Sequence, residues 1–164
     1  MSNVAVILVM AEEKWHEADF LRREIEYRGL ETVMLDMGLL GEPQGHCDIT
    51  REEVILASGR NPDEVALITD RGQRMPVMED GGREKVRELY SQGKLSAVIS
   101  LGGATGTQMG TSIMKSLPFG VPKFALSSTA SSQVKYAWPL PDHDLSIFLS
   151  NLHFRAFLYT KLPS

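Results

Sequence analysis

The sequence predicts an α/β fold: a doubly wound, mainly parallel sheet with helices on both faces, as in a Rossmann-like three-layer sandwich. Continuous apolar runs at residues 4–10, 32–37, 96–101 and 123–127 are typical of strands covered on both faces. Segments in which apolar residues recur at helical spacing alternate with these runs, which indicates a doubly wound sheet. The length suits one domain of this class, so residues 1–164 are assigned to a single domain.

The first elements form a β-α-β unit. The strand at 4–10 is followed by helical spacing over residues 14–28, and Gly29 is placed to end that helix. The next strand, 32–37, carries Asp36 near its end. A unit of this kind requires two parallel strands joined by a crossover.

The middle of the chain is predicted to hold three helices. Residues 50–53 (Thr-Arg-Glu-Glu) match a capping box and start the first, and Asn61 followed by Pro62 starts the second. The polar stretch 70–82 is interrupted by glycine and proline, which predicts a loop, and the third helix is expected over 83–92.

The last third is predicted to contain two further α/β connections. A glycine-rich loop at 102–107 follows the third strand and leads into a helix over 108–117. After the fourth strand the pattern weakens. Residues 144–149 are predicted as a fifth strand and 152–159 as a short terminal helix or strand.

The loop at 102–107, Gly-Gly-Ala-Thr-Gly-Thr, is the segment that says most about function. Glycines let a backbone approach a phosphate closely, and the N–H groups and dipole of the following helix point at it. The loop lacks the Lys-Ser or Lys-Thr of a P-loop, and the dinucleotide fingerprint would follow the first strand instead. The alternative is a tight strand-to-helix connection whose glycines serve packing alone.

The predicted nucleotide-phosphate site joins this loop to polar residues at two other strand ends. The carboxyl ends of parallel strands meet at one edge of the sheet, so Met10, Asp36, Gly102 and Ser127 should line it. Asp36 would hold a ribose hydroxyl or a metal, or else act as a turn or cap residue, and the loop serines are equally well explained as turn formers. The candidate binding residues are Asp36, Gly102, Gly103, Ala104, Thr105, Gly106, Thr107, Ser127, Ser128, Thr129 and Ser131.

Composition excludes several other classes of protein. The net charge of −4 and pI near 5.6 argue against nucleic acid as a partner. No apolar run is long enough to span a membrane, and no secretory signal is present, so a cytoplasmic location is expected. The single cysteine, Cys47, excludes a disulfide framework, and the histidines show no metal-ligand spacing. Catalytic residues cannot be named, because the neighbours His46 and Cys47 need not meet as base and nucleophile.

Four segments resemble a family of ATP-binding domains that contains the tomato mosaic virus resistance protein and its uncharacterised microbial relatives. They cover most of residues 30–132, whereas residues 133–164 form a divergent tail. The similar segments are 33–41 (Val-Met-Leu-Asp-Met-Gly-Leu-Leu-Gly), 48–54 (Asp-Ile-Thr-Arg-Glu-Glu-Val), 98–107, and 117–131 with its Gly-Val-Pro-Lys and Ser-Ser-Thr-Ala-Ser stretches. The resemblance implies ATP as the nucleotide, accompanied by Mg²⁺, and a second subdomain or a homodimer as partner.

The chain departs from the family pattern in its first loop and in the glycine loop. Glu12 and Glu13 stand where the family has small residues, which removes groups suited to anions. Ala104 and Thr105 replace a serine and a glycine, and a β-branched residue disfavours positive φ, so a different loop backbone is expected. Two alternatives to a nucleotide-binding domain follow. One is an interaction module whose pocket has decayed and is occluded by Glu12, Trp15 or His16, with an exposed apolar patch elsewhere. The other is a hydrolase that acts with a partner domain.

Overall fold

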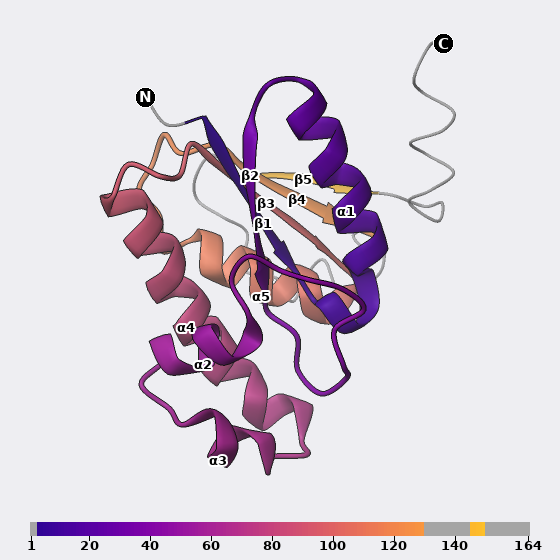
Figure 1. Cartoon of the computed structure of the whole chain (residues 1–164), viewed down its shortest axis with the longest axis vertical. Coiled ribbons are helices and arrows are strands. Elements are labelled where there is room, and N and C mark those ends of the chain that lie inside the picture. The colour runs from indigo at the N-terminus through magenta and orange to yellow at the C-terminus, as the bar shows by residue number, and fades with distance from the viewer. Residues whose placement is uncertain (1–2, 130–144, 150–164) are drawn as a thin grey trace.

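The computed structural model of the chain describes residues 3–129 and 145–149 (Figure 1). Its strands form one parallel sheet in the order β2-β1-β3-β4-β5, which confirms the predicted fold class. The predicted fifth strand is present and pairs with β4 in parallel. The strands are β1 (Val4–Val9), β2 (Glu31–Asp36), β3 (Ala97–Gly102), β4 (Lys123–Ser127) and β5 (Leu145–Leu149).

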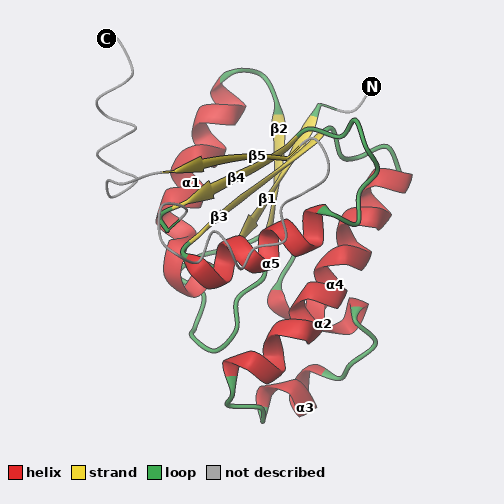
Figure 2. Ribbon diagram, turned by 180° about the vertical axis from the view of Figure 1, so that it is seen from behind, coloured by secondary structure: helices red, strands yellow, loops and turns green. Residues whose placement is uncertain are grey.

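The sheet is covered on both faces, as its apolar strands require (Figure 2). Helix α1 (Ala11–Tyr27) lies on one face, over a cluster that includes Ile7, Val9 and Met34. Helices α4 (Arg71–Ser91) and α5 (Ala104–Met114) cover the other face, where Val6, Leu8 and Leu35 are buried. Two shorter helices, α2 (Arg51–Ala57) and α3 (Pro62–Ala66), precede α4, and α3 lies farthest from the sheet (Figure 1).

Several helix boundaries follow the local signals in the sequence. Gly29 ends α1 with φ of +83°, a backbone conformation that other residues rarely adopt. Thr50 and Glu53 form the complete capping box at α2, and the Asn61 side chain accepts a hydrogen bond from the N–H of Asp63 at α3.

The predicted loop at 70–82 is wrong. Helix α4 begins at Arg71 and includes Pro76. The glycines in this stretch serve packing: a Cβ on Gly81 would lie 1.8 Å from the carbonyl oxygen of Val54, and one on Gly82 would lie 2.5 Å from Cδ1 of Ile113. Close contacts with α2 and α5 therefore explain why glycines stand inside this helix, although their low helix propensity alone indicates a loop.

The predicted start of the helix after β3 is also wrong, because α5 begins at Ala104 and not at residue 108. Most of the glycine loop is thus the first turn of the helix. Thr105 takes a helical conformation, which suits its branched side chain better than a positive φ would.

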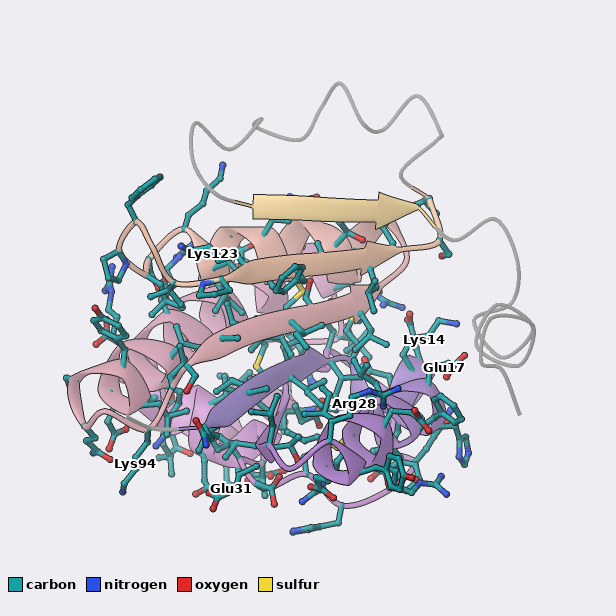
Figure 3. All side chains as sticks on the ribbon, turned by 90° about the horizontal axis from the view of Figure 1, so that it is seen from above. Lys14, Glu17, Arg28, Glu31, Lys94 and Lys123 are labelled. Carbon is teal, nitrogen blue, oxygen red and sulfur yellow. The ribbon has the colours of Figure 1, made fainter. Side chains whose placement is uncertain are left out.

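The carboxyl ends of the strands meet at one edge of the sheet. The register pairs Val9 with Asp36 and Gly102 with Ser127, which confirms that these strand ends lie together. In Figure 3 the arrowheads point toward the end of the molecule where Lys14 and Glu17 lie, whereas Glu31, Lys94 and Lys123 lie at the opposite end. The chain reverses its winding between the neighbours β1 and β3, and such a switch point is where ligands bind in open α/β sheets.

Candidate functional site

Helix α5 begins at the switch point with its N-terminal groups unused. Gly103 is the N-cap residue and offers no side chain to cap the helix. The first N–H bonded within the helix is that of Thr107, which donates to the Gly103 carbonyl at 3.0 Å. The preceding N–H groups of Ala104, Thr105 and Gly106 have no hydrogen-bond acceptor among the described residues. Three donors and the positive end of a helix dipole therefore converge at one place.

The glycines of the predicted loop have different roles. A Cβ on Gly102 would lie 2.6 Å from Cα of Gly106, so this glycine lets the helix turn back onto its strand. Gly106 in turn lies against Met10, whose Sδ would be 3.5 Å from an added Cβ. Gly103 differs, because among the described residues its added Cβ would meet nothing closer than the Ser128 hydroxyl at 3.9 Å. Close packing therefore explains Gly102 but not Gly103.

Two of the predicted hydroxyl ligands are used inside the fold. The Thr107 hydroxyl donates to the Gly103 carbonyl at 2.7 Å and lies 2.9 Å from the Ser127 hydroxyl. Both side chains are buried, and the N–H of Thr129 also donates to Ser127 Oγ at 3.2 Å. These bonds join the start of α5 to the end of β4. Ser128 is exposed, and its hydroxyl would lie 3.9 Å from a Cβ on Gly103; Ser131 lies outside the described residues.

Asp36 has the role of a turn residue. Its Oδ1 accepts hydrogen bonds from the N–H groups of Ala11 at 3.1 Å and Gly38 at 2.7 Å, which joins the start of α1 to the loop after β2. Its Oδ2 lies 3.4 Å from a guanidinium nitrogen of Arg51 and makes no hydrogen bond among the described residues. Burial raises the pKa of this carboxyl, and the charge of Arg51 opposes that rise.

A buried ion cluster beside Asp36 is the main feature that sequence reasoning missed. Glu12 accepts a hydrogen bond from the N–H of Leu39 at 2.7 Å and pairs with Arg51 at 3.0 Å. Arg51 also donates to the Gly41 carbonyl at 2.7 Å. The pairing of Glu12 with Arg51 spans 39 residues of sequence, so no local spacing could predict it.

A pocket of about 150 Å³ opens beside this cluster. Cys47 lines it and is 5% exposed, and burial raises the pKa of its thiol to about 12, which keeps the thiol protonated and a poor nucleophile. The pocket is lined by Asp36, Pro43, Gly45, His46, Cys47, Thr50, Arg51 and Glu52.

The side chains expected to occlude a decayed pocket are engaged elsewhere. Glu12 belongs to the ion cluster, and Trp15 donates from its indole N–H to the carbonyl of His46 at 3.0 Å. His16 is exposed and packs edge-on against Trp15 with ring centroids 5.3 Å apart. None of these contacts involves the first turn of α5.

Two arginines in the mispredicted loop lie on α4. Arg74 is buried and donates to the carbonyls of Ile68 at 2.6 Å, Ala66 at 2.8 Å and Leu39. Arg71 pairs with Glu13 at 2.7 Å on the surface. Arg74 therefore stabilises the α3–α4 connection and holds it to the loop after β2.

Comparison with known proteins identifies the family. Residues 3–152 match the N-terminal domain of an uncharacterised protein family, UPF0261. The chain belongs to this family. UPF0261 proteins of Clostridium tetani and Brucella suis are each 33% identical to it over 135 residues, which cover 82% and 81% of this chain. The tomato protein tm-1(GCR26), described as ToMV susceptible, is 31% identical over 88 residues, or 53% of this chain and 12% of its own length.

This UPF0261 domain spans about a third of the length of the bacterial relatives, with 33% of the Clostridium protein and 32% of the Brucella protein covered. Among the helices that the structure describes, none has the length and apolar character needed to cross a membrane. Within the same residues no group of three or more His, Cys, Asp and Glu side chains is arranged to hold a metal ion.

Proposed function

We propose that this domain binds the phosphate of a nucleotide at the N-terminus of α5, with ATP as the nucleotide that the family resemblance favours. One observation carries the proposal: three adjacent backbone N–H groups, of Ala104, Thr105 and Gly106, are left without acceptors at the switch point of the sheet. Phosphate oxygens are strong acceptors, and their charge is favoured at this end of a helix.

The surroundings of the three N–H groups support an anion. The first turn of α5 contains no acidic residue, and no described residue lies closer than 3.9 Å to the position of a Cβ on Gly103, so none of them blocks a ligand from the backbone there. The exposed hydroxyl of Ser128 is a further donor at the rim. Among the described residues no cluster of three or more His, Cys, Asp and Glu side chains is arranged to hold a metal ion, so Mg²⁺ enters the proposal only as the ion that accompanies ATP.

The proposal is tested by calorimetry with ATP, ADP and inorganic triphosphate in the presence of magnesium, using two variants of Gly103. Gly103→Asp places a carboxylate where it caps the free N–H groups and repels phosphate. Gly103→Ala adds the same Cβ, for which there is room, without an acceptor or a charge. We expect binding to the wild type, a loss of about a hundredfold or more with Gly103→Asp, and little change with Gly103→Ala.

The absence of binding by all three ligands to the wild-type protein would overturn the proposal. Equal binding by wild type and Gly103→Asp would place the phosphate elsewhere and would overturn it too. The free energy of unfolding of Gly103→Asp separates capping from misfolding. An added N-cap acceptor stabilises a helix by a few tenths of a kcal/mol relative to glycine, whereas a misfolded variant would lose stability.

Protein association is the second candidate function, and exposed leucines favour it. Leu56 on α2 is 60% exposed and Leu67 at the end of α3 is 82% exposed. Helix α3 lies farthest from the sheet and α2 lies against α4 (Figures 1 and 2), and there a second subdomain or a second copy of the chain would find exposed apolar side chains. If the chain self-associates through this surface, Leu56→Asp combined with Leu67→Asp converts the oligomer to a monomer in analytical ultracentrifugation. An oligomer that this change leaves intact would exclude this surface.

A further inference from the structure

The segment between β2 and α4 carries the negative charge of the whole chain. Residues 37–70 contain seven acidic residues and two arginines, which give this segment a formal charge of −5. The whole chain has a formal charge of −4, so the residues outside the segment sum to +1. The acidic residues are Glu42, Asp48, Glu52, Glu53, Asp63, Glu64 and Asp70. A potential of this sign on one part of a molecule attracts a basic partner.

Most of these carboxylates are not neutralised within the fold. The exposed acids that form no ion pair with another described residue are Glu42, Glu52, Glu53, Asp63, Glu64 and Asp70. Arg51 does not neutralise them, because it is paired with Glu12 at 3.0 Å. Arg71, the first residue of α4, is paired with Glu13 at 2.7 Å. Arg60 is exposed and is the remaining cation of the segment, so its surface stays strongly acidic.

Two exposed leucines lie among these carboxylates. Leu67 is 82% exposed, and its N–H donates to the carbonyl of Glu64 at 3.2 Å, which places it within one turn of that acid. Leu40 is 41% exposed and lies in the loop after β2, next to Gly41 and Glu42.

Arg74 holds together the two segments that carry these leucines. Its buried guanidinium donates to the carbonyls of the two residues that flank Leu67, and to the carbonyl of Leu39, which precedes Leu40. The loop after β2 and the α3–α4 turn therefore lie side by side. A surface fixed in this way loses little conformational entropy when a partner binds.

We propose that the acidic surface around Leu40 and Leu67 binds a basic, amphipathic segment of another protein. Apolar side chains of the partner cover the two leucines, and its lysines and arginines face the surrounding carboxylates. The inference rests on protein association, the second candidate function, and it names the chemistry of the partner. It is independent of the phosphate proposal.

The sign of the charge disfavours the other partners. In a two-fold dimer of this chain through the same surface, the same acids would face one another. Nucleic acids and anionic lipids are also negatively charged, so the surface repels them.

The test uses fluorescence anisotropy with a labelled amphipathic peptide of leucine and lysine, and with a peptide of leucine and glutamate as the charge control. We expect the wild type to bind the lysine peptide with a dissociation constant in the micromolar range and not to bind the glutamate peptide. The affinity for the lysine peptide should fall about tenfold or more as salt is raised, because exposed charges are screened.

Three substitutions locate the binding surface. Leu67→Ser and Leu40→Ser should each weaken binding of the lysine peptide about fivefold to tenfold. Leu30→Ser is the matched control, because Leu30 is 43% exposed, close to the 41% of Leu40. Leu30 precedes Glu31, which lies at the opposite end of the molecule (Figure 3), so this variant should bind as the wild type does.

The proposal is overturned if the lysine peptide does not bind the wild type, or if the glutamate peptide binds as well. It is also overturned if Leu67→Ser and Leu40→Ser bind as the wild type does, or if Leu30→Ser weakens binding as much as they do. Analytical ultracentrifugation separates the proposal from self-association. A monomer that binds the lysine peptide would support a separate partner, whereas a dimer through Leu67 that the lysine peptide does not dissociate would overturn the proposal.

Discussion

The helices α1 and α5 begin at neighbouring strand ends on opposite sides of the switch point, but the N–H groups at their starts are used differently. At α1, the carboxylate of Asp36 accepts the N–H of Ala11, and the first turn carries Glu12 and Glu13. At α5, the N-cap is a glycine, the first turn contains no acid, and three N–H groups have no acceptor among the described residues. The start of α1 is thus bound by a carboxylate of the chain itself, whereas the N–H groups at the start of α5 have no acceptor among the described residues.

The difference shows that the fold uses one helix end for its own stability and leaves the first N–H groups of the other without an acceptor among the described residues. Anions are favoured at both termini, and the carboxylates at α1 provide that anion from within the protein. They also join α1 to the β2–α2 loop through the N–H groups of Gly38 and Leu39. A phosphate bound at α5 would be the external counterpart of these carboxylates.

The largest expected effect comes from removing the carboxylate at the start of α1. Asp36→Ala leaves two buried N–H groups without an acceptor and removes one carboxylate from the Arg51 cluster, so we expect the free energy of unfolding to fall by about 3–5 kcal/mol. Urea unfolding measures it. Asp36→Asn retains the acceptor and should cost clearly less. Equal losses in the two variants would show that the charge, and not the two hydrogen bonds, stabilises this end.

The next effect is steric and occurs at the α5 end. Gly102→Ala places a Cβ 2.6 Å from Cα of Gly106, and because the contact is with backbone, the helix must move away from its strand. We expect a loss of about 1–3 kcal/mol in unfolding free energy. Gly103→Ala is the matched control, since its Cβ has room. If both substitutions are tolerated equally, the close approach of α5 to β3 is not needed for stability.

A smaller effect is expected from the hydroxyl pair that joins α5 to β4. Thr107→Val removes the hydrogen bonds of Thr107 to the Gly103 carbonyl and to Ser127 while keeping the side-chain shape, which should cost about 1 kcal/mol. Thr105 lies two residues earlier and makes no such side-chain bonds among the described residues, so Thr105→Val should change stability by less than about 0.5 kcal/mol. A larger loss from Thr105→Val than from Thr107→Val would contradict the structural role given to Thr107.

The order of the elements could be predicted from sequence, because buried parallel strands and helix caps have local patterns. The predicted strand at 4–10 corresponds to β1, and the capping box at Thr50 is complete in the structure. The predicted loop at 70–82 is wrong because its glycines answer to contacts with distant segments and not to a local pattern. Gly81 and Gly82 are required by contacts with other helices, and such contacts leave no periodic signal along the chain.

The candidate site could be predicted only in part. The sequence pattern located the strand ends. It did not reveal the ion cluster, because its members Glu12 and Arg51 lie far apart in sequence. One signal was present: a Cβ on Gly38 would lie 2.0 Å from Glu12 Oε2 and 2.1 Å from Arg51 Nη2, and one on Gly41 would lie 2.8 Å from Glu12 Cβ. The glycines of the β2–α2 loop therefore mark where the loop closes around Glu12. Sequence alone gives a glycine-rich loop but not the residue it encloses.

The last prediction uses pH, since only the α1 end is closed by a group that titrates. Burial raises the pKa of Asp36 above its ordinary value of 3.8, so the folded chain holds this proton more tightly than the unfolded chain does. Just above pH 3.8, protonated Asp36 therefore adds to the free energy of unfolding. This contribution is lost as the pH rises through the pKa of Asp36 in the folded chain. Asp36→Asn lacks this proton. Urea unfolding over that range should show the stability of the wild type falling relative to Asp36→Asn as pH increases. A difference that rises with pH would mean that burial is outweighed by the groups that favour the ionised carboxylate, which are the charge of Arg51 and the hydrogen bonds from the N–H groups of Ala11 and Gly38.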